Sequence, residues 1–147
     1  MKRTTIGSIS SGTMRPEDLI PSFVWEADHN RLSRENRNTL RAIKARYGSE
    51  GYYDSEESGW DIEELFDILN DVAPPYFYFG AHPGDGAEYG FWLSESFQED
   101  FDGPQLSDLA DLPAGYVGEF VVVNDHGNVS LYTRSRNGHV REIWAVV

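Results

Sequence analysis

The stretch WDIEELFDILNDV (Trp60–Val72) has the periodicity of a helix with two contrasting sides. One side is apolar, and we expect it to face the core. It consists of Ile62, Leu65, Phe66, Leu69 and Val72. The opposite side carries Glu63, Glu64, Asp67 and Asp71. The pair Pro74–Pro75 ends the helix, because helical conformation is disfavoured for a residue that precedes proline.

This helix lies in a segment that is acidic throughout. Between Gly48 and Gly115 the chain has 17 Asp and Glu residues and no Lys or Arg, whereas the net charge of the whole chain is −13. Three explanations are open: adaptation to high salt, a solvated face that keeps the protein soluble, and a binding surface. Salt adaptation would spread carboxylates over every surface. Their segregation in one part of the chain favours a binding surface.

Length and composition indicate one domain, residues 1–147, because 39% of the residues are hydrophobic and 14% are aromatic. The Ser-, Thr- and Gly-rich residues 1–13 are expected to be flexible. No apolar run approaches the ~18 residues of a membrane span, and the N-terminus lacks the apolar region of a secretory signal. The chain has no Cys, so a reducing cytoplasm is the expected location.

A first helix is predicted near Pro16–Ala27. Proline at the first helical position and the acids that follow it both suit a helix start. Pro21 conflicts with this assignment, because an interior proline loses a hydrogen bond and clashes one turn back. Either the helix begins near Ile20, or residues 16–20 form a separate turn.

A second helix is predicted from Arg34 to Tyr47, with Ser33 as the N-cap and Gly48 as the stop. One of its sides carries a basic stripe. The stripe consists of Arg34, Arg37, Arg41 and Lys44. Such a stripe can contact phosphates, pair with the chain's own carboxylates, or be solvated. The many acids of the chain favour the last two.

The last 72 residues, 76–147, read mainly as strands. The predicted strands are Tyr76–Ala81, Tyr89–Leu93, Tyr116–Val123, Val129–Arg134 and Val140–Val147. Asn137–Gly138 is a strong hairpin signal between the last two. Helices followed by strands, rather than alternating with them, indicate an α+β fold. We expect about three N-terminal helices packed on one face of an antiparallel sheet of about five strands.

The glycine-rich loop between the first two strands offers an alternative site. His82, Asp85 and Glu88 could supply nitrogen and oxygen ligands to a divalent metal, or form a small ligand-binding or enzymatic site. Their spacing matches no established metal signature, so no metal ligand and no cofactor is assigned. The chain lacks a nucleophile elbow and a phosphate-binding loop, and no catalytic residue is assigned. With so many acids a glycosidase-like pair stays open, but enzymatic activity is not the favoured interpretation.

The acidic helix can present a row of carboxylates about 6 Å apart along its axis. B-form DNA has one phosphate per 3.4 Å of axis on each strand, so a fixed array of this kind could occupy a cationic groove. The predicted partner-binding residues are Glu56, Glu57, Asp61, Glu63, Glu64, Asp67, Asp71, Glu95, Glu99, Asp100 and Asp102. Several aromatic residues among them are either contact anchors or core residues. These are Tyr52, Tyr53, Trp60, Phe97 and Phe101.

Two motifs, AHPGDGAEYGFW (Ala81–Trp92) and VVNDHGNVSLY (Val122–Tyr132), resemble those of short acidic proteins of phages and other mobile elements. That group includes inhibitors of host restriction and CRISPR systems, some of which mimic nucleic acid. The resemblance implies an anti-defence inhibitor that docks its carboxylates on a basic, nucleic-acid-binding host protein. It implies no catalytic residues, and we expect no direct contact with nucleic acid or membrane. The basic stripe departs from a pure mimic, and the oligomeric state stays open.

Overall fold

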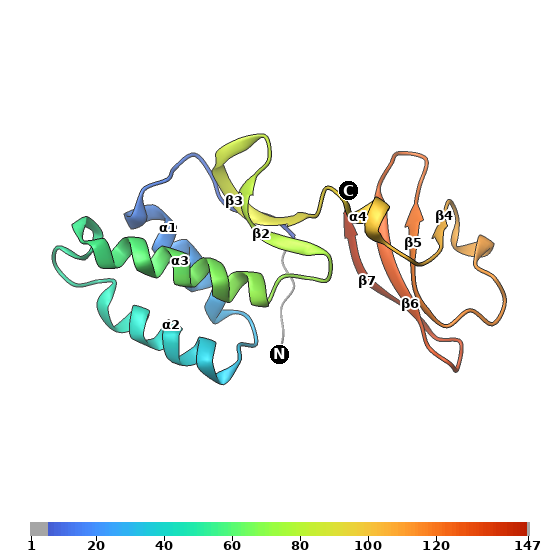
Figure 1. The fold of residues 1–147 in the computed structure, drawn as a ribbon, viewed down its shortest axis with the longest axis horizontal. Helices are drawn as coiled ribbons and strands as arrows, with labels where there is room; N and C mark the ends of the chain where they lie inside the picture. Colours follow the sequence, from blue (N-terminus) through green and yellow to red (C-terminus); the bar gives the residue numbers. More distant parts are fainter. Residues whose placement is uncertain (1–5, 147) are drawn as a thin grey trace. The chain divides into compact units, whose positions relative to one another are not determined.

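The computed structural model describes residues 6–146, and their fold belongs to the α+β class (Figure 1). The sequence predicted one domain, whereas the chain divides into two compact units, Met1–Glu95 and Ser96–Val147. Each unit has a sheet of its own. The prediction of a single sheet of about five strands is therefore wrong, because the strands form one sheet of three and one of four.

The first unit contains three α-helices and a three-stranded sheet. Its elements are β1 (Gly7–Ser10), α1 (Pro16–Asp28), α2 (Arg34–Arg46), the 3-10 helix η1 (Tyr52–Asp54), α3 (Glu56–Asp71), β2 (Phe77–His82) and β3 (Asp85–Leu93). The sheet order is β1-β3-β2, and both pairings are antiparallel. Strand β1 was not predicted. It lies within the segment expected to be flexible, of which residues 1–5 fall outside the described part.

Helix α1 begins at Pro16, as predicted, and runs without interruption through Pro21, so the two alternatives that Pro21 suggested, a start near Ile20 or a separate turn over residues 16–20, are wrong. Pro21 gives up one backbone hydrogen bond. The side of the helix that contains Ile20 and Phe23 is fully buried, and that burial outweighs the loss. Helix α2 has the predicted start, where the Ser33 hydroxyl accepts a hydrogen bond from the Asn36 backbone N–H at 3.1 Å. Helix α3 begins four residues before the predicted start, and acids fill its first turn.

The core of the first unit is aromatic where the helices meet the sheet. Phe23 of α1 contacts Phe79 of β2 with ring centroids 5.1 Å apart and Phe66 of α3 at 5.7 Å. Tyr89 of β3 completes the cluster, 5.8 Å from both Phe23 and Phe66. Phe79 pairs directly with Phe91 across the sheet. Helices α1 and α3 thus pack on the face of the sheet that carries these rings, and α2 packs on the two helices.

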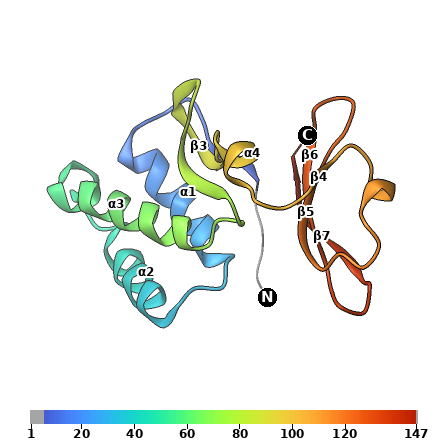
Figure 2. The same ribbon diagram turned by 45° about the vertical axis from the view of Figure 1, so that its right-hand side comes forward.

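The second unit is mostly sheet. Its elements are α4 (Phe97–Asp100), β4 (Gln105–Leu106), the 3-10 helix η2 (Leu109–Asp111), β5 (Gly118–Val123), β6 (Val129–Arg134) and β7 (Val140–Val146). Figure 2 shows β5, β6 and β7 side by side in one layer. The order is β4-β5-β6-β7, with β4 parallel to β5 and the other pairs antiparallel. Gly138, at φ +86°, makes the turn predicted at Asn137–Gly138.

Strand β1 is held against β3 at a point where only glycine fits. A Cβ atom on Gly90 would lie 2.1 Å from the Gly7 carbonyl oxygen. The same atom on Gly86, also in β3, would meet nothing within 4 Å. Strand β1 can therefore pair with β3 only because position 90 has no side chain.

We expect Gly90→Ala to lower the free energy of unfolding by about 2 kcal/mol, because the methyl group forces β1 away from β3. The measurement is urea denaturation monitored by circular dichroism. Gly86→Ala is the matched control in the same strand and should change stability by less than about 1 kcal/mol. Equal stability of the two variants would show that β1 does not make this close contact.

Candidate functional site

The solvent-facing side of α3 combines carboxylates with one large aromatic residue. The exposed residues on this side are Glu56, Trp60, Glu63, Glu64, Asp67 and Asp71. At 3.6 residues per turn they fall within roughly 100° of the helix circumference. Helix α3 contains no Lys or Arg. We call these six residues the acidic face.

Trp60 distinguishes the acidic face from an ordinary solvated helix surface. It is 61% exposed and lies one turn before Glu63 and Glu64. Large aromatic side chains that stay in water on a charged surface are the kind of residue that anchors protein interfaces. Of the five aromatics considered from the sequence, Tyr52, Phe97 and Phe101 are buried.

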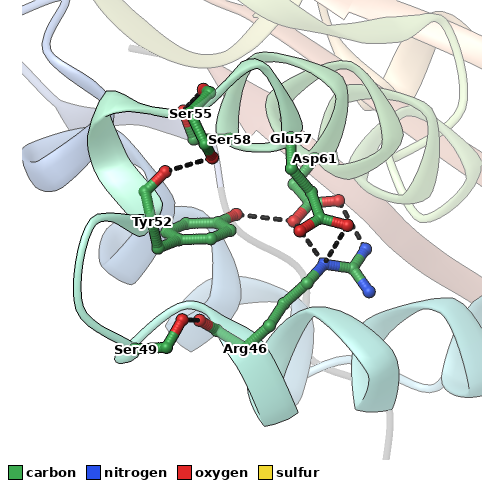
Figure 3. A network of polar contacts seen from close by, with 7 residues as sticks. All are labelled: Arg46, Ser49, Tyr52, Ser55, Glu57, Ser58 and Asp61. Carbon is green, nitrogen blue, oxygen red and sulfur yellow. Dashed lines mark hydrogen bonds and ion pairs between the residues drawn. The ribbon is translucent and has the colours of Figure 1, made fainter.

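Asp61 lies on the opposite side of α3 and anchors the helix to the rest of the unit (Figure 3). Its carboxylate is 2% exposed. Arg46, the last residue of α2, donates from Nε to Oδ2 at 2.9 Å and from Nη2 to Oδ1 at 2.6 Å. The Tyr52 hydroxyl donates to Oδ2 at 2.6 Å. Both carboxylate oxygens are therefore occupied, and the interpretation of Asp61 as a partner-binding residue is wrong.

Neighbouring residues contribute further contacts to the Arg46–Asp61 ion pair and to the start of α3. Burial, together with the hydrogen bond to Asp61, raises the pKa of the Tyr52 phenol. Arg46 also approaches Glu57, with 3.5 Å between Nε and Oε2, and the Asp61 hydrogen bonds raise the pKa of its guanidinium. The Ser58 hydroxyl donates to the Ser55 carbonyl at 2.8 Å, which ties the first turn of α3 to the preceding loop.

The remaining predicted partner-binding residues are not all brought together. Asp71 accepts a hydrogen bond from Asn36 Nδ2 of α2 at 2.8 Å, which fixes the far end of α3. Glu95 lies at the end of the first unit. Glu99, Asp100 and Asp102 are exposed residues of the second unit, in or next to α4. Of the seven predicted residues in α3, five lie on the acidic face, Asp61 is buried and Glu57 approaches Arg46, whereas the other four predicted residues lie outside this helix.

The glycine-rich loop is a turn whose polar side chains bond to its own backbone. Nδ1 of His82 accepts a hydrogen bond from the Gly84 N–H at 2.9 Å, and Oδ1 of Asp85 accepts one from the Ala87 N–H at 3.0 Å. The His82 ring also packs against Trp92 in a T-shaped arrangement, with ring centroids 4.7 Å apart. Across residues 6–146, no three His, Asp or Glu side chains are placed to hold a metal ion together. The turn gives these residues a structural role.

Comparisons with models of protein families, with curated proteins and with solved structures find no match for this chain. Within the described part, no helix has both the length and the apolar character needed to cross a membrane.

The Arg46–Asp61 pair allows a direct test of how α3 is anchored. We expect Arg46→Met or Asp61→Leu alone to lower the free energy of unfolding by about 3 kcal/mol, because each leaves one charged partner without its counterpart. The double variant should recover most of this loss, since two apolar side chains can pack together. Urea denaturation of all four proteins gives the coupling energy. Additive losses would contradict a coupled pair.

Proposed function

We propose that this protein is a binding protein and inhibitor whose acidic face docks on a basic, nucleic-acid-binding surface of a host protein. The observation that carries the proposal is the combination on α3 of five exposed carboxylates, no cation and an exposed Trp60. The resemblance to acidic proteins of mobile elements supports an anti-defence role, of the anti-restriction or anti-CRISPR type, in the cytoplasm of the host.

The dimensions of α3 suit this role. From Glu56 to Asp71 the helix axis extends about 22 Å at 1.5 Å per residue. The same length of B-form DNA carries about six phosphates on each strand. Carboxylates held at fixed positions can replace phosphates in a cationic groove, and they gain the same release of counterions and the same electrostatic steering.

The anchoring of α3 supports the proposal as well. A rigid array loses less conformational entropy on binding than carboxylates on mobile loops. The ion pair of Arg46 with the buried Asp61 and the Asn36–Asp71 hydrogen bond fix α3 near both ends. Leu65 and Leu69, both fully buried, fix its middle. The acidic face is therefore presented in one orientation.

Charge neutralisation on α3 should abolish partner binding without unfolding the protein. The variant is Glu56→Gln, Glu63→Gln, Glu64→Gln and Asp67→Asn together. Asp71 is left unchanged because it holds Asn36. The measurement is affinity capture from a bacterial lysate at about 0.1 M salt, release at about 0.5 M salt, and mass spectrometry of the released proteins.

A matched control removes the same number of charges from exposed acids elsewhere. It carries Glu35→Gln, Glu50→Gln, Asp125→Asn and Glu142→Gln. We expect the wild type and the control to capture the same nucleic-acid-handling protein, and the α3 variant to bind it at least about tenfold more weakly. If both variants lose affinity for the partner equally, only the net charge of the protein matters. If both bind the partner as the wild type does, the acidic face is not the binding surface.

Trp60→Ala tests whether the aromatic residue is a contact anchor. With the captured partner purified, we expect affinity to fall by about 2 kcal/mol, roughly 30-fold, because an interfacial Trp loses its contact area. Stability should change by less than about 0.5 kcal/mol, since the side chain is mostly in water. Trp25→Ala on α1, 53% exposed in the wild type, is the control. Unchanged affinity of Trp60→Ala would remove Trp60 from the interface.

A further inference from the structure

A cavity of about 260 Å³ opens between the end of α1 and one side of α2. Its apolar part is formed by Ala27, Leu32 and Leu40, all buried. Its polar part is formed by Asp28, by Asn30 and by the exposed side chains of Arg37, Arg41 and Lys44, so that three of these five residues are cations and one is a carboxylate. The cavity therefore combines an apolar floor with a cationic rim, in a chain whose net charge is −13.

Two of the three cations on the rim are not neutralised by the protein itself. Lys44 donates to both carboxylate oxygens of Asp28, at 3.0 and 2.8 Å. Within residues 6–146, by contrast, no carboxylate lies within ion-pair distance of Arg37 or Arg41. Of the alternatives left open for the basic stripe, pairing with the chain's own carboxylates is confirmed for Lys44, whereas Arg37 and Arg41 are exposed without such a pair among the described residues.

Each of these arginines forms a side-chain hydrogen bond that positions it at the rim, and its other N–H donors can bind a ligand. Nη1 of Arg37 donates to the Leu32 carbonyl at 3.2 Å, and Nη1 of Arg41 donates to Oδ1 of Asn38 at 3.2 Å. A guanidinium has five N–H donors in a planar fork that matches carboxylate and phosphate oxygens. Arg37 and Arg41 are four residues apart, so they are neighbours on the surface of α2.

We propose that this cavity binds a small organic anion, in which a carboxylate or phosphate group is attached to an apolar body. The anionic group would lie between Arg37 and Arg41, and the body would cover Leu32 and Leu40. The volume is just below the range of about 300–1,000 Å³ typical of ligand sites, which indicates a compact ligand. The apolar residues of the cavity would add nothing to the binding of the phosphate backbone of a nucleic acid. The negative net charge of the protein would also repel so long a polyanion. A small amphiphilic anion therefore fits better than nucleic acid.

This site is independent of the proposed function. The cavity is lined by α1, α2 and the loop between them, whereas the acidic face is on α3. Loss of ligand binding should leave capture of a protein partner unchanged, and neutralisation of the acidic face should leave the cavity intact.

The test uses the full chain and four probes: benzoate, phenyl phosphate, inorganic phosphate and the neutral benzamide. Binding is followed through the backbone amide signals in two-dimensional NMR spectra. We expect saturable shifts in residues of α1 and α2 with benzoate or phenyl phosphate at concentrations up to about 10 mM. Whichever anion binds more tightly identifies the preferred head group. Inorganic phosphate and benzamide, each of which lacks one of the two features, should bind at least about tenfold more weakly.

Variants of the rim link the shifts to the arginines. Arg41→Gln should weaken binding at least about tenfold. The substitution removes the hydrogen bond from Arg41 to Asn38 of the same helix. Arg34→Gln, on the same helix but outside the cavity, is the control and should bind as the wild type does. No saturable shift with either aromatic anion would overturn the proposal. Equal binding of benzamide, or unchanged affinity of Arg41→Gln, would also overturn it.

Discussion

The carboxylate of Asp61, buried and bound by Arg46 and Tyr52, is the constraint on which the first unit depends. A charge removed from water must be matched by partners with good geometry, or it destabilises the fold by several kcal/mol. Here the guanidinium of Arg46 donates to both carboxylate oxygens of Asp61, and the Tyr52 hydroxyl donates to one of them. The end of α2, the 3-10 helix η1 and the start of α3 must therefore come together in one arrangement, and this arrangement determines which side of α3 faces water.

The two sides of α3 consequently have different tasks. The inner side fills the core between α1 and the sheet, where Leu65 and Leu69 are fully buried. The outer side is not needed for packing, so it can carry like charges at the cost of some mutual repulsion. The acidic face holds carboxylates close together without compensating cations, so the fold must offset their mutual repulsion. A cationic partner would reduce this repulsion. Arg37 and Arg41 on α2 differ from the acidic face in two respects: they are cations, and apolar residues lie beside them in the cavity.

Much of this could be predicted from the sequence, and the failures have physical reasons. The α3 stripe, the Ser33 cap and the Asn137–Gly138 turn are local patterns, and all three are present in the structure. Asp61 looked like any other acid of α3, because only the distant Arg46 and Tyr52 make its burial favourable. Strand β1 has a short Ser- and Gly-containing sequence, and strand β4 has two residues, so neither shows a periodicity. Local patterns also predict individual strands without showing which of them share a sheet.

The contact of β1 with β3 at Gly90 determines which strands form the edges of the three-stranded sheet. In the order β1-β3-β2, strand β3 is central: β2 pairs with one of its sides, and β1 pairs with the other side at Tyr89, Gly90 and Phe91. Without β1, one side of β3 would become an open edge next to Tyr89 and Phe91, and open edges of this kind recruit strands from other chains. The short strand Gly7–Ser10 therefore covers this part of β3, and the missing side chain at position 90 is what lets it lie there.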